Sequence, residues 1–129
     1  MKKLIAVYLF LLSTTLSFAQ IGPKIKFMAK DNTIDYGLIK KGEDDGVRVF
    51  EFENTGDQPL IINNVKSNCG CLVFTKPDYP IMPGKRGKIV VKYKMTVGLI
   101  RKTFLVDTDA VNAENDYISL RIKGEVLEK

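Results

Sequence analysis

Lys88-Ile89-Val90-Val91-Lys92-Tyr93-Lys94-Met95 is the stretch that decides the fold of this chain. Apolar side chains occupy the odd-numbered positions of the stretch, and lysines occupy positions 88, 92 and 94. Successive side chains of a β-strand point to opposite faces of a sheet. This two-residue period therefore predicts a strand with one buried face and one face in water.

The same alternation recurs along the chain on both sides of this stretch. It predicts further strands at residues 25–27, 34–39, 46–53, 103–108 and 117–126, and one beginning at residue 60. Gly, Pro, Asn and Asp fill the segments between them, as they do in turns. About seven short strands in about 110 residues predict an all-β fold, an immunoglobulin-like antiparallel β-sandwich. A small β-barrel is the alternative.

Asn54-Thr55-Gly56 forms the expected turn after the strand at residues 46–53. We expect the Asn54 side chain to bond the backbone that follows it, and Gly56 to adopt a positive φ. The apolar residues on either side of this turn are expected to meet in the core between the sheets: Phe50, Phe52, Leu60 and Ile62.

The first nineteen residues have the three parts of a secretory signal peptide. Lys2 and Lys3 precede an apolar run at residues 4–12, and Ser17-Phe18-Ala19 supplies small residues for the peptidase. We expect cleavage after Ala19, which leaves residues 20–129 as one exported domain, periplasmic or secreted. An uncleaved membrane anchor is the alternative, but the apolar run is shorter than the ~20 residues of a spanning helix. We expect no membrane span after the signal is removed.

The composition excludes several classes of enzyme. The chain contains no histidine, the commonest general base and metal ligand, so histidine-dependent triads and metalloprotease motifs are excluded. Loss of the signal peptide would lower the formal net charge from +5 to +3. The basic residues are spread along the chain without interleaved aromatic residues, and we expect no nucleic-acid partner.

Several short motifs occur in an order that resembles a known family. They are Asp35-Tyr36-Gly37, Lys41-Gly42, Phe50-Glu51-Phe52-Glu53-Asn54-Thr55-Gly56, Gln58-Pro59-Leu60-Ile61-Ile62, Cys69-Gly70-Cys71 and Pro83-Gly84. Over residues 24 to 126 the sequence resembles the bacterial DUF1573 family, a domain of unknown function found in exported proteins of Bacteroidetes-type bacteria. It also resembles the ASPM/SPD-2/Hydin immunoglobulin-like domains. The resemblance implies an immunoglobulin-like β-sandwich and export, and it implies no established activity. Tyr36 stands where the family more usually has Phe.

Cys69-Gly70-Cys71 holds the only two cysteines of the chain. Gly70 permits a bend that would let the two sulfurs form a local disulfide. Such a bond closes a three-residue loop, which stabilises the fold by only about 1.6 kcal/mol. In the reduced form, Lys66 and Lys76 are close enough in sequence to lower a thiol pKa if they approach in space.

Three other interpretations of the two cysteines remain open. Their thiolates suit Cu(I), with a thioether from Met28, Met82 or Met95 as a further ligand. They could instead be small buried side chains, or form a bond to another chain. Zinc would need more ligands than the chain offers near them.

The favoured hypothesis is an exported, non-enzymatic β-sandwich that binds or scaffolds another component of the cell envelope. The acidic loop at residues 42–46 and the basic loop at residues 83–87 are candidate contacts. The alternative is a thiol-based redox or Cu(I)-binding protein that uses Cys69 and Cys71. We expect no catalytic residue and no other cofactor. Glu43-Asp44-Asp45 lacks the oxygen spacing of a calcium loop.

Overall fold

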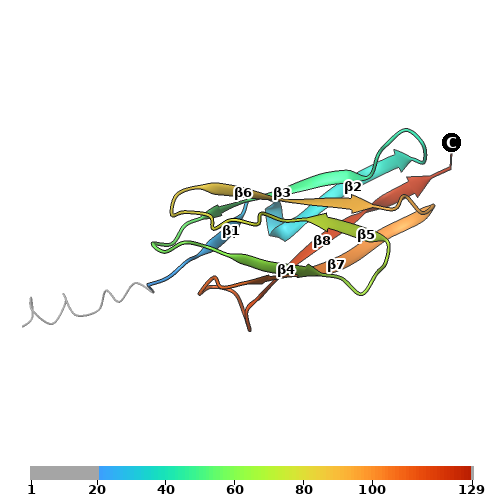
Figure 1. Ribbon diagram of the computed structural model, residues 1–129. Coiled ribbons are helices and arrows are strands. Elements are labelled where there is room, and N and C mark those ends of the chain that lie inside the picture. Colours follow the sequence, from blue (N-terminus) through green and yellow to red (C-terminus); the bar gives the residue numbers. More distant parts are fainter. Residues whose placement is uncertain (1–20, 129) are drawn as a thin grey trace, which may run out of the picture.

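The computed structural model describes residues 21–128 as two β-sheets packed face to face (Figure 1). The predicted signal peptide and its cleavage after Ala19 lie outside these residues. The described elements are β1 (Ile25–Phe27), the 3-10 turn η2 (Lys30–Asn32), β2 (Thr33–Lys40), β3 (Val47–Asn54), β4 (Ile62–Lys66), β5 (Leu72–Thr75), β6 (Arg86–Tyr93), β7 (Gly98–Thr108) and β8 (Tyr117–Leu127). No helix among them is long and apolar enough to cross a membrane.

One sheet has the strand order β1-β3-β6-β5, and the other has the order β2-β8-β7-β4. The first sheet is antiparallel throughout, whereas β2 runs parallel to β8 in the second. The predicted β-sandwich is confirmed, and two separate sheets exclude the barrel. The structure adds β5, a four-residue strand that the sequence pattern did not predict. The parallel pairing of β2 with β8 was not predicted either. Alternation indicates which face of a strand is buried, and it does not indicate the direction of the neighbouring strand.

The alternation along β6 places its side chains as predicted. Ile89, Val91 and Tyr93 are buried, whereas Lys88 and Lys92 are exposed on the outer face. The predicted core residues are also confirmed, since all four side chains around the turn after β3 are at least 97% buried. Aromatic rings join the two sheets, because Phe50 of β3 packs edge-on against Phe104 of β7 with 5.4 Å between centroids. Burial of each such ring contributes about 1.5–3 kcal/mol.

Asn54, at the end of β3, is fully buried and closes the turn that follows. Its Oδ1 accepts the Gly56 N–H at 2.9 Å, which confirms the expected bond. Its Nδ2 donates to the carbonyl oxygens of Gln58 (2.7 Å) and Ile81 (2.8 Å). One side chain therefore satisfies backbone groups of two different segments inside the protein.

The expectation that Gly56 has a positive φ is wrong. Glycine is required there for a different reason, since a Cβ at this position would collide with the Gly22 carbonyl oxygen and the Lys24 amide. The segment before β1 passes directly over the turn, and the Asp57 N–H donates to the Gly22 carbonyl at 3.2 Å. Close approach of two backbones therefore accounts for this glycine.

Candidate functional site

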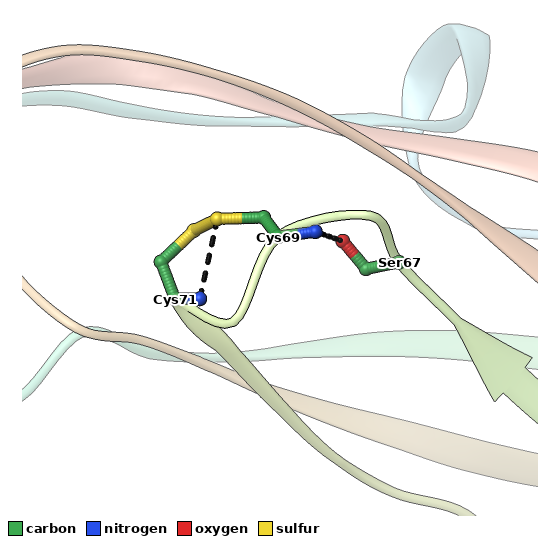
Figure 2. Close-up of a disulfide and its surroundings, with 3 residues drawn as sticks. All are labelled: Ser67, Cys69 and Cys71. Atoms are coloured by element: carbon green, nitrogen blue, oxygen red, sulfur yellow. Dashed lines mark hydrogen bonds between the residues drawn. A yellow bond between two sulfur atoms is a disulfide. The ribbon is translucent and has the colours of Figure 1, made fainter.

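The Cys-Gly-Cys segment lies in the connection that carries the chain from β4 in one sheet to β5 in the other. Cys69 and Cys71 are joined there by a disulfide, with 5.2 Å between their Cα atoms (Figure 2). The Ser67 hydroxyl accepts the Cys69 N–H at 3.1 Å, and the Cys69 sulfur accepts the Cys71 N–H at 3.2 Å. Both cysteines are half-buried, and Cys71 packs against the hydrophobic core.

The two lysines near the disulfide in sequence are engaged with other groups. Lys66 Nζ lies 3.3 Å from the Tyr117 hydroxyl and 5.6 Å from the centre of that ring. Lys76 Nζ lies 3.5 Å from an oxygen of Asp78. The structure therefore directs both ammonium groups to partners other than the sulfurs.

Of the three predicted thioether residues, Met95 lies at the same end of β6 as the disulfide, whereas Met28 and Met82 lie elsewhere along the sheet. Lys94 N–H donates to the Cys71 carbonyl, which places the disulfide at the end of β6 that also carries Met95. Met95 is buried there, and Met82 lies before the opposite end of β6. The Met28 amide bonds Glu51 within the sheet.

Copper binding at Cys69 and Cys71 requires that the disulfide between them be reduced. A disulfide offers no thiolate, so Cu(I) would bind only after reduction. Within residues 21–128, no group of three or more Cys, Asp or Glu side chains is placed to hold a metal ion.

The acidic loop at residues 42–46 uses its charges to hold its own shape. Asp44 receives two hydrogen bonds from Arg48 (2.9 and 3.1 Å) and one from the Gly46 N–H (2.7 Å). The Arg48 hydrogen bonds hold the pKa of the Asp44 carboxyl below its usual value. Asp45 accepts the N–H of Val47. The Asp44 and Asp45 carboxylates are thus turn caps, and this loop is a poor candidate contact.

Tyr36 links β2 to the same loop. Its buried hydroxyl donates to the Gly46 carbonyl at 2.8 Å, and the Arg48 guanidinium lies 4.2 Å from the centre of its ring. Burial raises the pKa of Tyr36 to about 12. The hydroxyl thus joins β2 to the end of the acidic loop, a hydrogen bond that Phe at this position could not make.

The basic loop at residues 83–87 lies at the opposite end of the sandwich from the disulfide. The Gly84 N–H donates to the carbonyl of Asn54, the last residue of β3. The acidic loop lies at the other end of β3, directly before its first residue, Val47. Arg86 reaches Glu51 (3.6 Å) and Glu53 (3.9 Å) on the exposed face. Exposed pairs of this length stabilise a fold by at most about 1 kcal/mol. The basic loop is therefore apart from the disulfide and from the acidic loop. Those two both lie at the other end of β6, where the Tyr93 N–H donates to the Gly46 carbonyl and the Lys94 N–H donates to the Cys71 carbonyl.

The family model described as "Protein of unknown function (DUF1573)" matches residues 27–126. The chain belongs to the DUF1573 family. A search of curated proteins found no match to this DUF1573 chain.

Several solved structures share the fold of this DUF1573 domain. A protein of unknown function from Porphyromonas gingivalis W83 matches with a TM-score of 0.67 and 14% identity, over 86% of this chain and 50% of that one. The ASH/PapD-like domain 7 of human CEP192 matches with a TM-score of 0.57 and 12% identity, over 88% and 94% of the two chains. The secreted serine protease VesC from Vibrio cholerae matches with a TM-score of 0.54 and 10% identity, over 81% and 23%. This chain thus spans about half of the first protein and under a quarter of the third. At these identities the likeness establishes the immunoglobulin-like fold alone.

One surface of the DUF1573 domain was not predicted from the sequence. Ile61, Val73 and Tyr79 expose 43%, 64% and 64% of their surface, and all three belong to β5 or to segments adjoining β4 and β5. A shallow pocket of about 300 Å³ lies between residues 61–63 and residues 76–80. We name this region, residues 61–63 and 72–80, the β4–β5 side. The available signal was the short apolar run Leu72-Val73-Phe74, which shows no alternation with polar residues and is too short to stand out as a strand.

Proposed function

We propose that this DUF1573 domain is exported, loses residues 1–19, and serves as a non-enzymatic module that binds another polypeptide of the cell envelope. The sequence of the leader supports export, and cleavage after Ala19 gives the mature domain of residues 20–129. The secreted protease VesC carries a region of the same fold, which is consistent with a role outside the cytoplasm.

The binding proposal rests on the exposed apolar side chains of the β4–β5 side. Large apolar side chains are exposed along it beside a pocket, and clustered exposed apolar surface marks interaction sites in soluble proteins. Proteins of this architecture offer strand edges and loops as contact surface. The binding partner is therefore expected to be a polypeptide that covers apolar surface.

Crosslinking in the native envelope tests this proposal. Tagged protein, mildly crosslinked and purified, should carry a second envelope polypeptide and should have the intact mass of residues 20–129. Tyr79→Ser should reduce the yield of that adduct, whereas the control Leu38→Ser should not, since Leu38 is 72% exposed but lies on β2. Recovery of the protein alone, or of unprocessed protein, counts against the proposal.

A second candidate function is thiol–disulfide exchange at Cys69 and Cys71. The disulfide between these half-buried cysteines favours it, because exchange begins when an external thiolate attacks a disulfide sulfur. In such a step the incoming thiolate bonds one cysteine sulfur, the bond between Cys69 and Cys71 breaks, and the other cysteine leaves as a thiolate. A second external thiol completes the reduction, and only the resulting dithiol could bind Cu(I).

Thiol titration separates the two candidates. Purified mature protein should show no free thiol before treatment with a small dithiol reductant and two afterwards, and the reduced form is then titrated with Cu(I). If the disulfide resists reduction in the folded protein, the thiol–disulfide exchange hypothesis fails. If it is reduced but the reduced form binds no Cu(I), the copper-binding alternative fails. The binding proposal is unaffected by either result.

A further inference from the structure

The two sheets have four edge strands, and three of them carry features that hinder pairing with another strand. On β1, the Asn112 side chain bonds both the N–H and the C=O of Ile25, at 3.0 and 2.9 Å. On β4, Asn64 Oδ1 accepts the N–H of Val65 at 2.9 Å, and the pairing with β7 is shifted. β2 is interrupted by a register shift against β8. Such features protect edges from pairing with foreign strands.

The fourth edge strand, β5, has a free row of main-chain groups. The Lys94 N–H donates to the Cys71 carbonyl, so Cys71 and then Val73 face β6 in the antiparallel ladder. Main-chain groups alternate in direction along a strand, and those of Leu72 and Phe74 therefore face away from β6. Within residues 21–128, β5 pairs with β6 alone. An incoming strand would thus find two N–H donors and two C=O acceptors.

The free edge of β5 leads toward the pocket of the β4–β5 side. Residues 76–80 follow β5 directly and form one wall of the pocket, and residues 61–63 at the beginning of β4 form the other. The β4–β5 connection with the disulfide lies at the other end of the strand (Figure 1). An extended chain paired with β5 and continuing past Thr75 would therefore reach this pocket. Tyr79 and Ile61 offer it apolar contacts there.

The charges beside β5 favour an acidic partner. The strand itself carries no charge, but β6 presents Lys88 and Lys92 on the outer face, followed by Lys94. None of the ion pairs in the described residues involves these three lysines. An incoming strand would lie about 10 Å from β6, two strand spacings, which is comparable to the Debye length at 0.1 M salt. Acidic side chains on its outer face would therefore be attracted.

A second copy of this chain fits the edge less well. Two copies paired through β5 would contact each other along four residues each, whereas stable interfaces use about 20–30 residues a side. The lysines of both copies would also lie on one continuous sheet face, which disfavours the pair.

We propose that β5 binds an extended, acidic and apolar segment of another polypeptide as an added strand. This inference rests on the proposed binding function and specifies its mode. Main-chain hydrogen bonds to Leu72 and Phe74 hold the segment, and its inner side chains contact the pocket of the β4–β5 side. Its outer side chains are acidic and face the lysine row of β6.

The test uses two charge variants matched for exposure. Val73→Glu places a carboxylate opposite Lys92, which keeps the sheet paired but repels an acidic strand. Leu99→Lys is the control, because Leu99 is 66% exposed, lies in the other sheet and faces Glu125. The probes are ten-residue peptides in which valine alternates with glutamate or with lysine. Binding is followed by NMR of the backbone amides and by their hydrogen exchange.

The glutamate peptide should shift and protect the amides of Leu72 and Phe74. Its Kd should rise at least tenfold in Val73→Glu and change less than twofold in Leu99→Lys, and the lysine peptide should bind at least tenfold more weakly. Absence of binding, equal binding of both peptides, or an unchanged Kd in Val73→Glu overturns the inference. So does a concentration-dependent dimer that Val73→Glu abolishes, which would assign the edge to a second copy. If an envelope adduct forms but maps away from β5, the binding function stands and only this mode fails.

Discussion

Replacement of Asn54 by alanine should destabilise the domain strongly. The side chain makes three hydrogen bonds of 2.9 Å or less inside the protein, to Gly56, Gln58 and Ile81. Each such bond contributes about 1 kcal/mol net, and a buried group left without a partner costs about 1–3 kcal/mol. The three together give a loss of about 3–4 kcal/mol in the free energy of unfolding. At roughly 4 °C per kcal/mol for a domain of this size, the melting temperature should fall by about 12–16 °C.

Urea unfolding of the mature domain with its disulfide intact measures this loss. Asn63→Ala is the matched control, since Asn63 is exposed on β4 and its replacement should change stability by less than about 0.5 kcal/mol. A loss below about 1 kcal/mol for Asn54→Ala, or one equal to that of the control, would refute the assignment of Asn54 as the side chain that joins the turn to the segment at Ile81.

Three further predictions concern the turn, the tyrosine and the disulfide. Gly56→Ala should cost about 1–3 kcal/mol through backbone overlap, whereas Gly70→Ala should cost less than about 0.5 kcal/mol because a Cβ there meets nothing within 4 Å; equal losses in urea unfolding would contradict this. The pKa of Tyr36 is raised from 10.0 to about 12 in the folded state, so its stabilisation is complete below pH 10 and is lost between pH 10 and about 12. Between pH 9 and pH 11 the free energy of unfolding should fall by about 1 kcal/mol more in the unaltered protein than in Tyr36→Phe. Equal losses in the two proteins would contradict this prediction. The double variant Cys69→Ser, Cys71→Ser should lose at most about 1.6 kcal/mol in thermal unfolding, and a loss above about 3 kcal/mol would show that the short loop does more than chain entropy allows.

The parts of the fold that the sequence predicted are those in which one physical pattern acts over many residues. The alternation along β6 continues for a full strand, and the buried face it indicated is the face that packs on the other sheet. β5 has only four residues, too few for a period to stand out, so it was missed. The parallel pairing of β2 with β8 depends on the path of the chain, which alternation does not record.

The turn after β3 and the candidate site were harder to predict, because they depend on individual contacts that no periodic pattern of residues reports. The expected role of Gly56 was wrong because the segment at Gly22 passes over it, 34 residues away in sequence. The charges of the acidic loop suggested a contact surface. In the structure, however, the Arg48 guanidinium and the Gly46 N–H donate hydrogen bonds to the Asp44 carboxylate. The free edge of β5 became visible only once its neighbours in the sheet were known.

Photocrosslinking inside the native envelope tests the central functional claim most directly. A photoreactive residue at position 73 lies on the β4–β5 side, and one at position 99 is equally exposed on the other sheet. A polypeptide adduct formed at position 73 and absent at position 99 is the predicted result. No adduct at position 73, or the same adducts at both positions, would contradict the account.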